Sequence, residues 1–339
     1  MDIFERHCTP WIRNLIEVGN VTTNEINHAF SLRNLPGILF VSTLSLLGIS
    51  GNFLVIWIFG LKFNQSSYRI YVLCLAVLDF INCFMTMPFV LTYLLYMENY
   101  PSELLCKIGH LIGFFIGIAS PFTLILIAAD RYRNVCRPLS LQWSARRAKL
   151  MCLFINIVAL FISWYVPIVY GTTEMKSVNR SIVLVQCFKE NGTLSQTITW
   201  WQYIILTGLF TLVSAFLIVI YLVIMINVRR KSKLFTKYNP EEHIQDANIT
   251  FTNRIIHTKK ATVTFFIISS VYVLSSLVHH VLALFLHVVQ NVECKMSYTQ
   301  SVLFWSFFWT VFINNVANPV IYGLSDTRFK QCIKSMFSN

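Results

Sequence analysis

Seven apolar stretches, each long enough to cross a bilayer as a helix, constrain this chain more than any other feature of its sequence. A helix rises about 1.5 Å per residue, so about 20 apolar residues cross a hydrocarbon core. The stretches cover residues 36–61, 69–96, 106–131, 149–170, 200–228, 260–289 and 299–323. With 55% hydrophobic and 12% charged residues, the composition is wrong for a soluble protein. We expect an all-α membrane protein with a seven-helix bundle over 36–325.

Basic residues are distributed unequally between the two sets of connecting segments. Nineteen of the 27 Lys and Arg residues fall in 62–69, 131–149, 229–260 and the tail, whereas the opposite set is near neutral. Because short cytoplasmic loops retain Lys and Arg, residues 1–35 are predicted to be extracellular and 326–339 cytoplasmic. The chain is then a multi-pass protein of the plasma membrane. Its net charge of +12 reflects this orientation and indicates no nucleic-acid partner.

Glycosylation sequons and four cysteines fall on the predicted outer side. The sequons begin at Asn20, Asn179 and Asn191. The outer cysteines, which can form disulfides there, are Cys8, Cys106, Cys187 and Cys294. A bridge between Cys106 and Cys187 would hold the loop after the fourth span over the bundle. A second bridge, between Cys8 and Cys294, would tie the N-terminus to the last outer loop.

Polar residues interrupt the second and seventh spans. Asp79 is the only charged residue deep within a span, and burying it costs about 2.5–3.5 kcal/mol on insertion scales. In the seventh span Pro319 removes a backbone hydrogen bond beside Asn315 and Asn318. Asp79 or water can supply hydrogen bonds to the polar groups of this flexible segment.

The third span ends in an acid, a base and a phenol. Asp130, Arg131 and Tyr132 follow 22 residues, 108–129, that contain no charged side chain. A membrane boundary explains the location of polar residues here, but not this choice of them. An adjacent carboxylate can hold Arg131 in one state and release it in another, as a switch requires.

Together these motifs resemble the rhodopsin-like (class A) family of G-protein-coupled receptors. The resemblance covers all seven spans and the tail. Its matching residues are Gly51-Asn52, Leu75–Asp79, Cys106, Asp130-Arg131-Tyr132, Cys187, Tyr221 and Asn318–Tyr322. The 25 residues that separate Cys106 from Arg131 are the interval that the family keeps.

The resemblance implies a receptor, and not an enzyme, in which an extracellular ligand opens the inner side of the bundle to a heterotrimeric G protein, with arrestin as a further partner. Arg131 and Leu139 would contact the G protein. Tyr221 and Tyr322 would stabilise the open state, with Pro319 as part of the same switch. A sodium and water pocket is implied at Asn52, Asp79, Ser120, Asn315 and Asn318, and no other cofactor is expected.

The tail has apolar residues at helical spacing with basic residues between them. This pattern over 326–339 predicts a short amphipathic eighth helix that lies on membrane lipids. Cys332 on this helix is a candidate for palmitoylation.

The sixth and fifth spans depart from the family pattern. Ser276 stands where the family has a tryptophan, and Val278 stands where it has a kinking proline. The fifth span has Val213 at its proline position, while Pro121 lies unusually inside the third span. We expect the core between the third, fifth and sixth spans to repack.

The sequence gives less information about the ligand pocket than about the other sites. Its candidate residues are His110, Gly113, His279, His280 and Trp305. Gly113 stands where amine receptors have Asp, which argues against a salt-bridged monoamine. An uncharged cavity under a long outer loop favours a peptide over a lipid. Gly113 also belongs, with Gly109 and Gly117, to a stripe of small residues that predicts close helix packing.

Two alternatives stay open. The missing tryptophan and proline of the sixth span are compatible with a decoy receptor that binds its ligand without signalling. Gly48–Gly51 matches the Gly-x-Ser-Gly of an intramembrane serine protease, with Ser50 as nucleophile and His279 or His280 as base. A transporter is disfavoured because the chain has no internal repeat.

Overall fold

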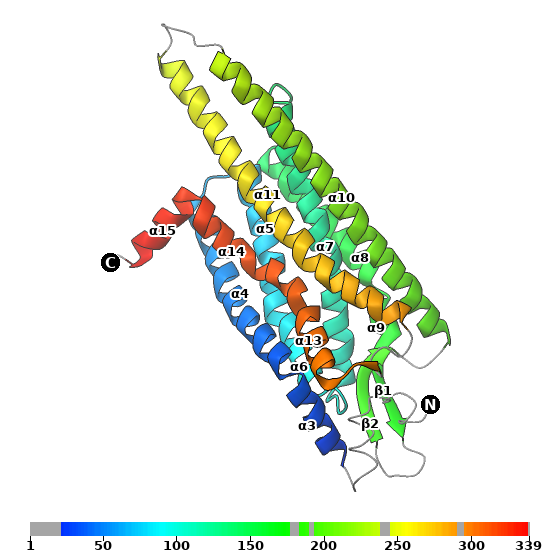
Figure 1. Ribbon diagram of the computed structural model, residues 1–339. Coiled ribbons are helices and arrows are strands. Elements are labelled where there is room, and N and C mark those ends of the chain that lie inside the picture. The colour runs from blue at the N-terminus through cyan, green and yellow to red at the C-terminus, as the bar shows by residue number, and fades with distance from the viewer. Residues whose placement is uncertain (1–21, 177–182, 190–192, 238–244, 290–294, 338–339) are drawn as a thin grey trace.

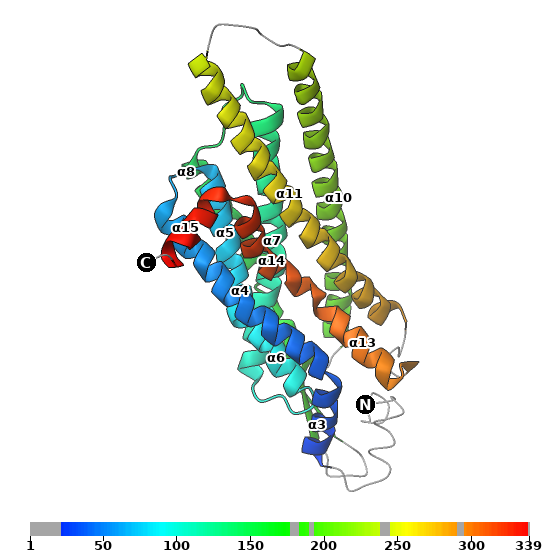
Figure 2. The same ribbon diagram turned by 60° about the vertical axis from the view of Figure 1, so that its left-hand side comes forward.

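The computed structural model describes residues 22–176, 183–189, 193–237, 245–289 and 295–337. Helices occupy all seven predicted spans (Figures 1 and 2). The first six spans are α4 (Leu35–Lys62), α5 (Ser67–Ile81) with η1 (Asn82–Thr86) and α6 (Met87–Leu95), α7 (Glu103–Cys136), α8 (Ala145–Ser163) with α9 (Val166–Val169), α10 (Thr193–Lys237) and α11 (Gln245–Val288). The seventh is α13 (Tyr298–Phe308), η2 (Trp309–Phe312) and α14 (Ile313–Ser325).

Six of these spans are each long and apolar enough to cross a membrane as one helix. The seventh is divided by the 3-10 turn η2, so that neither α13 nor α14 is long enough alone. Taken together, the three pieces cover the predicted stretch 299–323. The predicted seven-helix membrane bundle is therefore confirmed.

The two ends of the bundle carry different additions. At one end, called the hairpin end below, lie the antiparallel strands β1 (Tyr170–Lys176) and β2 (Val183–Lys189). At the other, called the α15 end, the predicted eighth helix is present as α15 (Thr327–Phe337). There α10 and α11 also extend beyond the other helices (Figures 1 and 2). The sequence predicted α15 but neither strand.

Helix α15 is amphipathic, as its spacing predicted. Phe329 is buried, and Cys332 and Ile333 are half-buried on the same face, where they pack on the main core. Lys330 and Lys334 are exposed. The basic residues thus project away from the bundle.

A further helix at the hairpin end, α3 (Thr23–Arg33), was not predicted from the sequence. Thr22 and Glu25 form a reciprocal cap at its start, and hydrogen bonds from the backbone N–H and the hydroxyl of Thr22 lower the pKa of the Glu25 carboxyl. Asn27 donates to the carbonyl oxygen of Leu95 at 2.8 Å, and Thr23 donates to that of Val183 at 3.1 Å. Helix α3 therefore ties α6 to β2.

Apolar side chains cover the outside of the bundle as well as its interior. Leu46, Phe161 and Leu212 are among the exposed large residues on the spans. Inside, a cluster that includes Phe59 and Tyr322 is fully buried. An apolar exterior of this extent is stable against lipid tails and not against water, because lipid imposes no hydrophobic penalty on it.

The stripe of small residues on α7 packs closely at one position only. A Cβ at Gly109 would lie 2.1 Å from the Phe89 ring, whereas one at Gly113 would meet Thr86 at an ordinary 3.4 Å. At Gly117 no atom of the described residues outside the helix's own turn lies within 4 Å of that position. The prediction of close helix packing is right at Gly109 and wrong at Gly117.

Gly109→Ala should lower the free energy of unfolding by about 1–3 kcal/mol, because the added methyl group forces the Phe89 ring to move. Gly117→Ala is the matched control, since its methyl group enters open space and alanine favours a helix. Thermal unfolding of the purified proteins in detergent measures the difference. Equal unfolding midpoints for the two variants would show that the Phe89 ring moves aside without lowering the free energy of unfolding.

Candidate functional site

The first polar centre lies around Asp79, which is fully buried in α5. Asn315 donates its side-chain amide to Asp79 Oδ1 at 2.8 Å, and Asn318 donates to Oδ2 at 2.6 Å. The two asparagines are three residues apart on α14 and so share one face of the helix. Asp79 therefore binds the second span to the seventh with one donor for each carboxylate oxygen.

Pro319 explains why α4 joins this centre. Because proline has no N–H, it leaves the carbonyl group four residues earlier, that of Asn315, without its helical donor. Asn52 supplies the replacement, since its side-chain amide lies 2.8 Å from the Asn315 carbonyl oxygen. A Cβ at Gly51 would lie 3.0 Å from the Pro319 ring, so glycine lets the two helices approach. Gly51 thus leaves room for the Pro319 ring, and Asn52 donates to the carbonyl group that the proline leaves without a donor.

Ser120 is not a hydrogen-bond partner of this centre. It is buried in α7, but its hydroxyl has no partner among the residues that the structure describes. The same holds for the buried Asn52 Oδ1 and Tyr322 hydroxyl. The implied pocket therefore has an amide-bonded carboxylate at Asp79 and separate buried oxygens that have no partner.

The second polar centre is the acid and base at the end of α7. Asp130 and Arg131 are both buried and form an ion pair. Asn134, one turn further along, donates to Asp130 Oδ2 at 2.9 Å. The Arg131 guanidinium also lies 5.6 Å from the centre of the Phe265 ring, which belongs to α11. Arg131 is thus held by its neighbour on α7 and covered by an aromatic ring of the sixth span.

The other predicted switch residues surround this pair without bonding to it. Tyr132 is half-buried, with its ring 6.0 Å from the Arg137 guanidinium. Tyr221 is buried edge-on against Phe266 at 5.6 Å. Tyr322 is buried 5.7 Å from Phe59. Within the described chain, neither the Tyr221 nor the Tyr322 hydroxyl has a hydrogen-bond partner.

Leu139 is fully exposed in the turn that follows α7. The turn is ordered by its own polar groups: Gln142 donates to the carbonyl oxygens of Arg137 at 3.1 Å and Ser140 at 3.0 Å, and Arg133 donates to that of Leu141 at 2.6 Å. These bonds hold the backbone while the leucine side chain projects from it.

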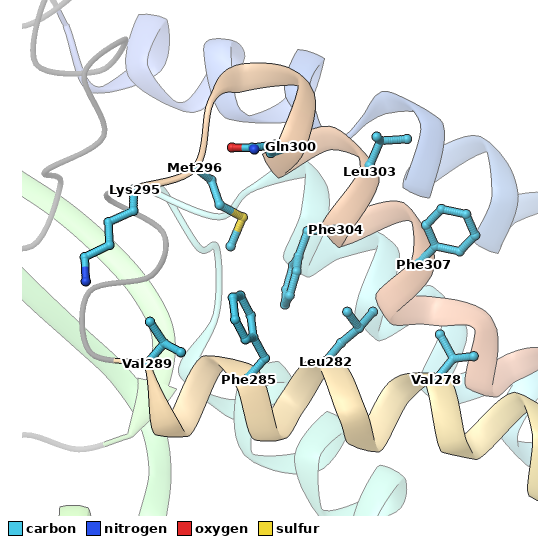
Figure 3. Close-up of a pocket in the computed structure, with 10 residues that line it drawn as sticks. All are labelled: Val278, Leu282, Phe285, Val289, Lys295, Met296, Gln300, Leu303, Phe304 and Phe307. Carbon is cyan, nitrogen blue, oxygen red and sulfur yellow. The ribbon is translucent and has the colours of Figure 1, made fainter.

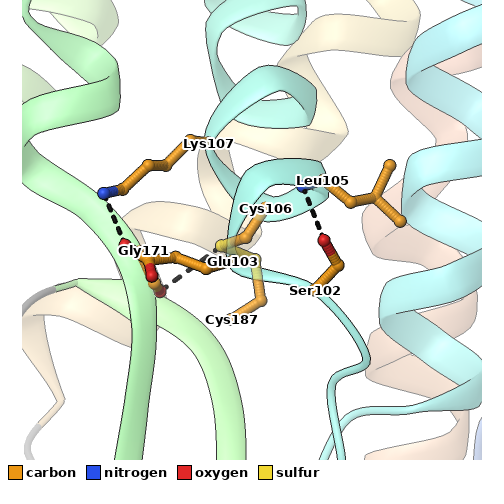
Figure 4. The surroundings of a disulfide bond; sticks show 7 residues. All are labelled: Ser102, Glu103, Leu105, Cys106, Lys107, Gly171 and Cys187. Carbon is orange, nitrogen blue, oxygen red and sulfur yellow. Dashed lines mark hydrogen bonds and ion pairs between the residues drawn. A yellow bond between two sulfur atoms is a disulfide. The ribbon is translucent and has the colours of Figure 1, made fainter.

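At the hairpin end, a disulfide joins Cys106 in α7 to Cys187 in β2 (Figure 4). The hydroxyl of Ser102 caps α7 just before it by accepting from the backbone N–H of Leu105 at 3.3 Å. Cys8 and Cys294 lie outside the described residues, as do the sequons at Asn20, Asn179 and Asn191.

The candidate ligand residues lie on three spans. His110 stacks on Tyr170 with ring centres 4.1 Å apart. His280 stacks on Phe210 at 4.3 Å, while His279 Nδ1 lies 2.8 Å from the Phe308 carbonyl oxygen. His279 and His280 therefore reach from α11 toward opposite neighbours, and no ring contact joins either to His110 in the described chain.

Several polar atoms of this region are buried without a hydrogen bond inside the described part of the protein. They include His110 Nε2, His280 Nδ1 and Trp305 Nε1. Gly113 of α7 faces Thr86 of η1 and provides no charge here. An unpaired buried polar group costs about 1–3 kcal/mol, so each of these atoms retains unused hydrogen-bonding capacity.

The sixth span has repacked around a different aromatic residue. Ser276 is buried and fills little space at the position of the missing tryptophan. One turn earlier, the buried Tyr272 ring meets Phe210 of α10 at 6.2 Å in an edge contact. Helix α11 runs unbroken through Val278, whereas Pro121 lies buried within α7. At this level of the bundle Tyr272 supplies an aromatic contact between the fifth and sixth spans, in addition to those of His280 with Phe210 and Phe266 with Tyr221.

Ser50 does not form a catalytic pair. Its hydroxyl is exposed on the outside of α4 and donates to the carbonyl oxygens of Leu46 at 2.9 Å and Leu47 at 3.2 Å. His279 is bound to the Phe308 backbone instead. A protease would need Ser50 within hydrogen-bond reach of a histidine.

Two contacts near the switch were missed from the sequence. Asn134 lies one helical turn from Asp130, a spacing that could have revealed it. The second contact is the Tyr68 hydroxyl, which donates to Asp326 Oδ2 at 3.1 Å while its ring packs edge-on against Phe265 at 5.5 Å. No sequence signal joins Tyr68 to Asp326, because the bond connects segments 258 residues apart.

Asn318→Ala should destabilise the protein by about 1–3 kcal/mol, because it leaves one buried Asp79 oxygen without a donor. Asn227→Ala is the control, since that side chain donates to Val223 on its own helix. Thermal unfolding measures both. In an Asp79→Ala background the cost of Asn318→Ala should shrink. An unchanged cost there would mean that the Asp79 bond is not its source.

Comparison with known proteins agrees with this architecture. The model of the family described as 7 transmembrane receptor (rhodopsin family) matches residues 51–322. Trace amine-associated receptor 13c of Danio rerio is 24% identical over 332 residues, which are 96% of this chain and 90% of that receptor.

Two shorter matches are to receptors named for other ligands. A C3a anaphylatoxin chemotactic receptor of Oncorhynchus mykiss is 33% identical over 129 residues, 37% of this chain and 35% of the relative. Chemerin-like receptor 2 of Mus musculus is 31% identical over 191 residues, 54% of this chain and 53% of the relative. In these two matches the chain spans about half of the relative's length or less. Because the family model covers most of the chain, the protein belongs to the rhodopsin family of seven-transmembrane receptors, whose members are multi-pass membrane signalling proteins and not enzymes.

Proposed function

We propose that this chain is a receptor of the plasma membrane that binds an extracellular ligand, with a peptide favoured, and activates heterotrimeric G proteins by opening its α15 end. The observation that carries this function is the burial of Arg131 between Asp130 of its own helix and Phe265 of α11. The ionic partner of this cation lies on α7 and the aromatic partner on α11. Movement of either helix relative to the other can therefore free the guanidinium, as a two-state switch requires.

Opening follows from displacement of α11. When Phe265 moves away, Arg131 loses its aromatic cover and can turn from Asp130 toward a partner. The exposed Leu139 is already at this end of the bundle. The uncovered surface then combines a cation with an apolar side chain, which suits the C-terminal helix of a G protein. Arrestin is a second partner for the same surface.

The orientation rests on charge. The segments at the α15 end hold 19 of the 27 Lys and Arg residues, which supports a cytoplasmic α15 end and an extracellular hairpin end. Residues 1–35 then form an extracellular segment before the bundle of 36–325, and 326–339 form a cytoplasmic tail that rests on membrane lipids. Asn20, Asn179 and Asn191 are the glycosylation candidates, and Cys332 is the palmitoylation candidate.

A peptide ligand is favoured by two observations. Gly113 supplies no carboxylate to pair with an amine, although one relative over nearly the full chain is a trace amine-associated receptor. Other relatives are named C3a anaphylatoxin chemotactic receptor, C5a anaphylatoxin chemotactic receptor 1 and chemerin-like receptor 2, and the anaphylatoxin names support a peptide ligand here. His110, His280 and Trp305 would then supply the polar contacts, since each has a buried nitrogen that lacks a partner in the described chain.

A sodium ion fits the first polar centre in part. Sodium binds oxygen ligands, and Asp79 provides a carboxylate, while Asn52 Oδ1 and Ser120 Oγ are buried oxygens with no partner in the part of the chain described. The amides of Asn315 and Asn318 already satisfy one lone pair on each Asp79 oxygen. Asp79, Asn52 and Ser120 are therefore the residues that would hold the ion.

Arg131→Ala should leave surface expression and ligand binding intact and abolish G-protein coupling, because it removes the cation that the open bundle presents. Arg146→Ala, an exposed arginine on α8, is the control. The measurement is G-protein dissociation in cells across Gα subtypes, with fractionated peptide extracts as stimulus. Coupling that survives in Arg131→Ala would defeat the proposed switch. Silence of the unmutated chain at verified surface expression would favour the decoy receptor.

Ser276→Trp combined with Val278→Pro should raise ligand-free activity, because the pair restores an aromatic residue and a helix kink and so shifts the balance toward the open bundle. Ser276→Ala with Val278→Ala is the control for loss of the native side chains. The same dissociation measurement, without ligand, detects the change. Unaltered or lower activity would mean that Tyr272 has taken over the packing role at this level.

A further inference from the structure

Two free cysteines meet between the second and fourth spans, and the proposed function uses neither of them. Cys74 lies on α5 and Cys152 on α8, and both pack in the main apolar core. Their thiol groups are in hydrogen-bonding contact with each other across the helix interface. The two cysteines are called the dithiol below.

Both sulfurs of the dithiol lie at the same depth in the bundle. Helix α5 begins at Ser67 and α8 at Ala145, and both helices start at the α15 end (Figures 1 and 2). Cys74 and Cys152 each follow the start of their helix by seven residues, which is a rise of about 10 Å. Half of a hydrocarbon core is about 15 Å thick. The dithiol therefore lies at the depth of the acyl chains of one leaflet.

Asn156 of α8 holds the dithiol from one side. Its side-chain amide donates to the backbone carbonyl oxygen of Cys152 at 2.8 Å and to Cys74 Sγ at 3.8 Å. A donor at sulfur supports the thiolate, which is the form that attacks a peroxide. Cys74 is also half-buried, whereas only 6% of Cys152 is exposed. Cys74 is therefore the sulfur that reacts first, and Cys152 is the second thiol within its reach.

We propose that the dithiol is a modification site, which the hydroperoxide group of a peroxidised phospholipid oxidises to a disulfide between α5 and α8. Acyl chains surround these helices at this depth, because both belong to apolar segments of membrane-crossing length. A hydroperoxide on an oxidised acyl chain is in the same layer as Cys74. The disulfide would join the second span to the fourth, and its formation requires neither a receptor ligand nor a G protein.

The oxidation takes two steps and consumes one hydroperoxide. In the first step, Cys74 Sγ attacks the terminal oxygen of the hydroperoxide, so that an S–O bond forms, the O–O bond breaks and a lipid alcohol leaves with the thiol proton. In the second, Cys152 Sγ attacks Cys74 Sγ, so that the S–S bond forms, the S–O bond breaks and water leaves with the second thiol proton. The two thiols are oxidised, and the peroxide is reduced to the alcohol and water.

The test is oxidation of the full chain, treated with a mild thiol reductant, in phosphatidylcholine nanodiscs that contain phosphatidylcholine hydroperoxide. Remaining thiols are alkylated after denaturation, and the digest is analysed by mass spectrometry without reduction. The alkylated Cys74 and Cys152 peptides should be lost, and one linked peptide should replace them. Met296, whose thioether lies in the apolar groove between α11 and α13 (Figure 3), sets the dose: the hydroperoxide is raised until this sulfur gains oxygen.

Two variants separate the steps from general oxidation. Cys152→Ser should stop the reaction at the sulfenic acid of Cys74, which dimedone traps as a stable adduct. Cys83→Ser is the matched control, because Cys83 is a buried cysteine of the same span, and it should leave the linked peptide unchanged.

Three results would overturn the proposal. The first is a native protein whose Cys74 and Cys152 peptides stay fully alkylated at the dose that oxidises Met296. The second is the absence of a dimedone adduct at Cys74 in Cys152→Ser. The third is faster linkage by hydrogen peroxide in the surrounding water than by the lipid hydroperoxide, because the oxidant would then come from the aqueous phase.

Discussion

A carboxylate in the middle of a membrane bundle must find donors, and much of the geometry of this protein follows from that need at Asp79. Asn315 and Asn318 provide the donors from α14. The proline that follows them frees a backbone carbonyl group, which Asn52 satisfies from α4. The first, second and seventh spans therefore meet at one point, and removing any one partner would leave a buried polar group unpaired.

The two halves of the bundle treat their polar groups differently. Around Asp79 and Arg131, the charged groups are paired with side chains of the protein itself. In the hairpin half, His110, His280 and Trp305 each keep a buried nitrogen that no described residue satisfies. Neutral polar atoms without a partner in the described chain also occur near these centres, at Asn52 Oδ1 and at the Ser120 and Tyr322 hydroxyls. The two regions therefore differ in charge: the charged groups are paired by the protein, whereas the ring nitrogens of the hairpin half are not.

Hydropathy was enough to predict the seven spans and α15, because a backbone in lipid must satisfy its own hydrogen bonds and so must be helical. The polar centres could also be located, since Asp79 and Arg131 are conspicuous in apolar surroundings. Their partners could not all be predicted: Ser120 was expected at Asp79 but forms no bond to it, and Phe265 was not expected over Arg131. The hairpin depends on packing between distant segments, which periodicity does not encode, whereas the Thr22-x-x-Glu25 capping signature could have revealed the start of α3.

Besides the packing of Phe329 on the main core, one polar bond joins the start of α15 to α5, from the Tyr68 hydroxyl to Asp326. Asp326 Oδ1 accepts from the backbone N–H groups of Arg328 and Phe329 at the start of the helix, while its other oxygen accepts from Tyr68. The Tyr68 ring is held by Phe265, the same ring that covers Arg131. A motion of α11 that uncovers Arg131 therefore also removes the support of the α15 cap. One aromatic ring of α11 thus couples two features far apart in the sequence, the guanidinium at the end of α7 and the first turn of α15.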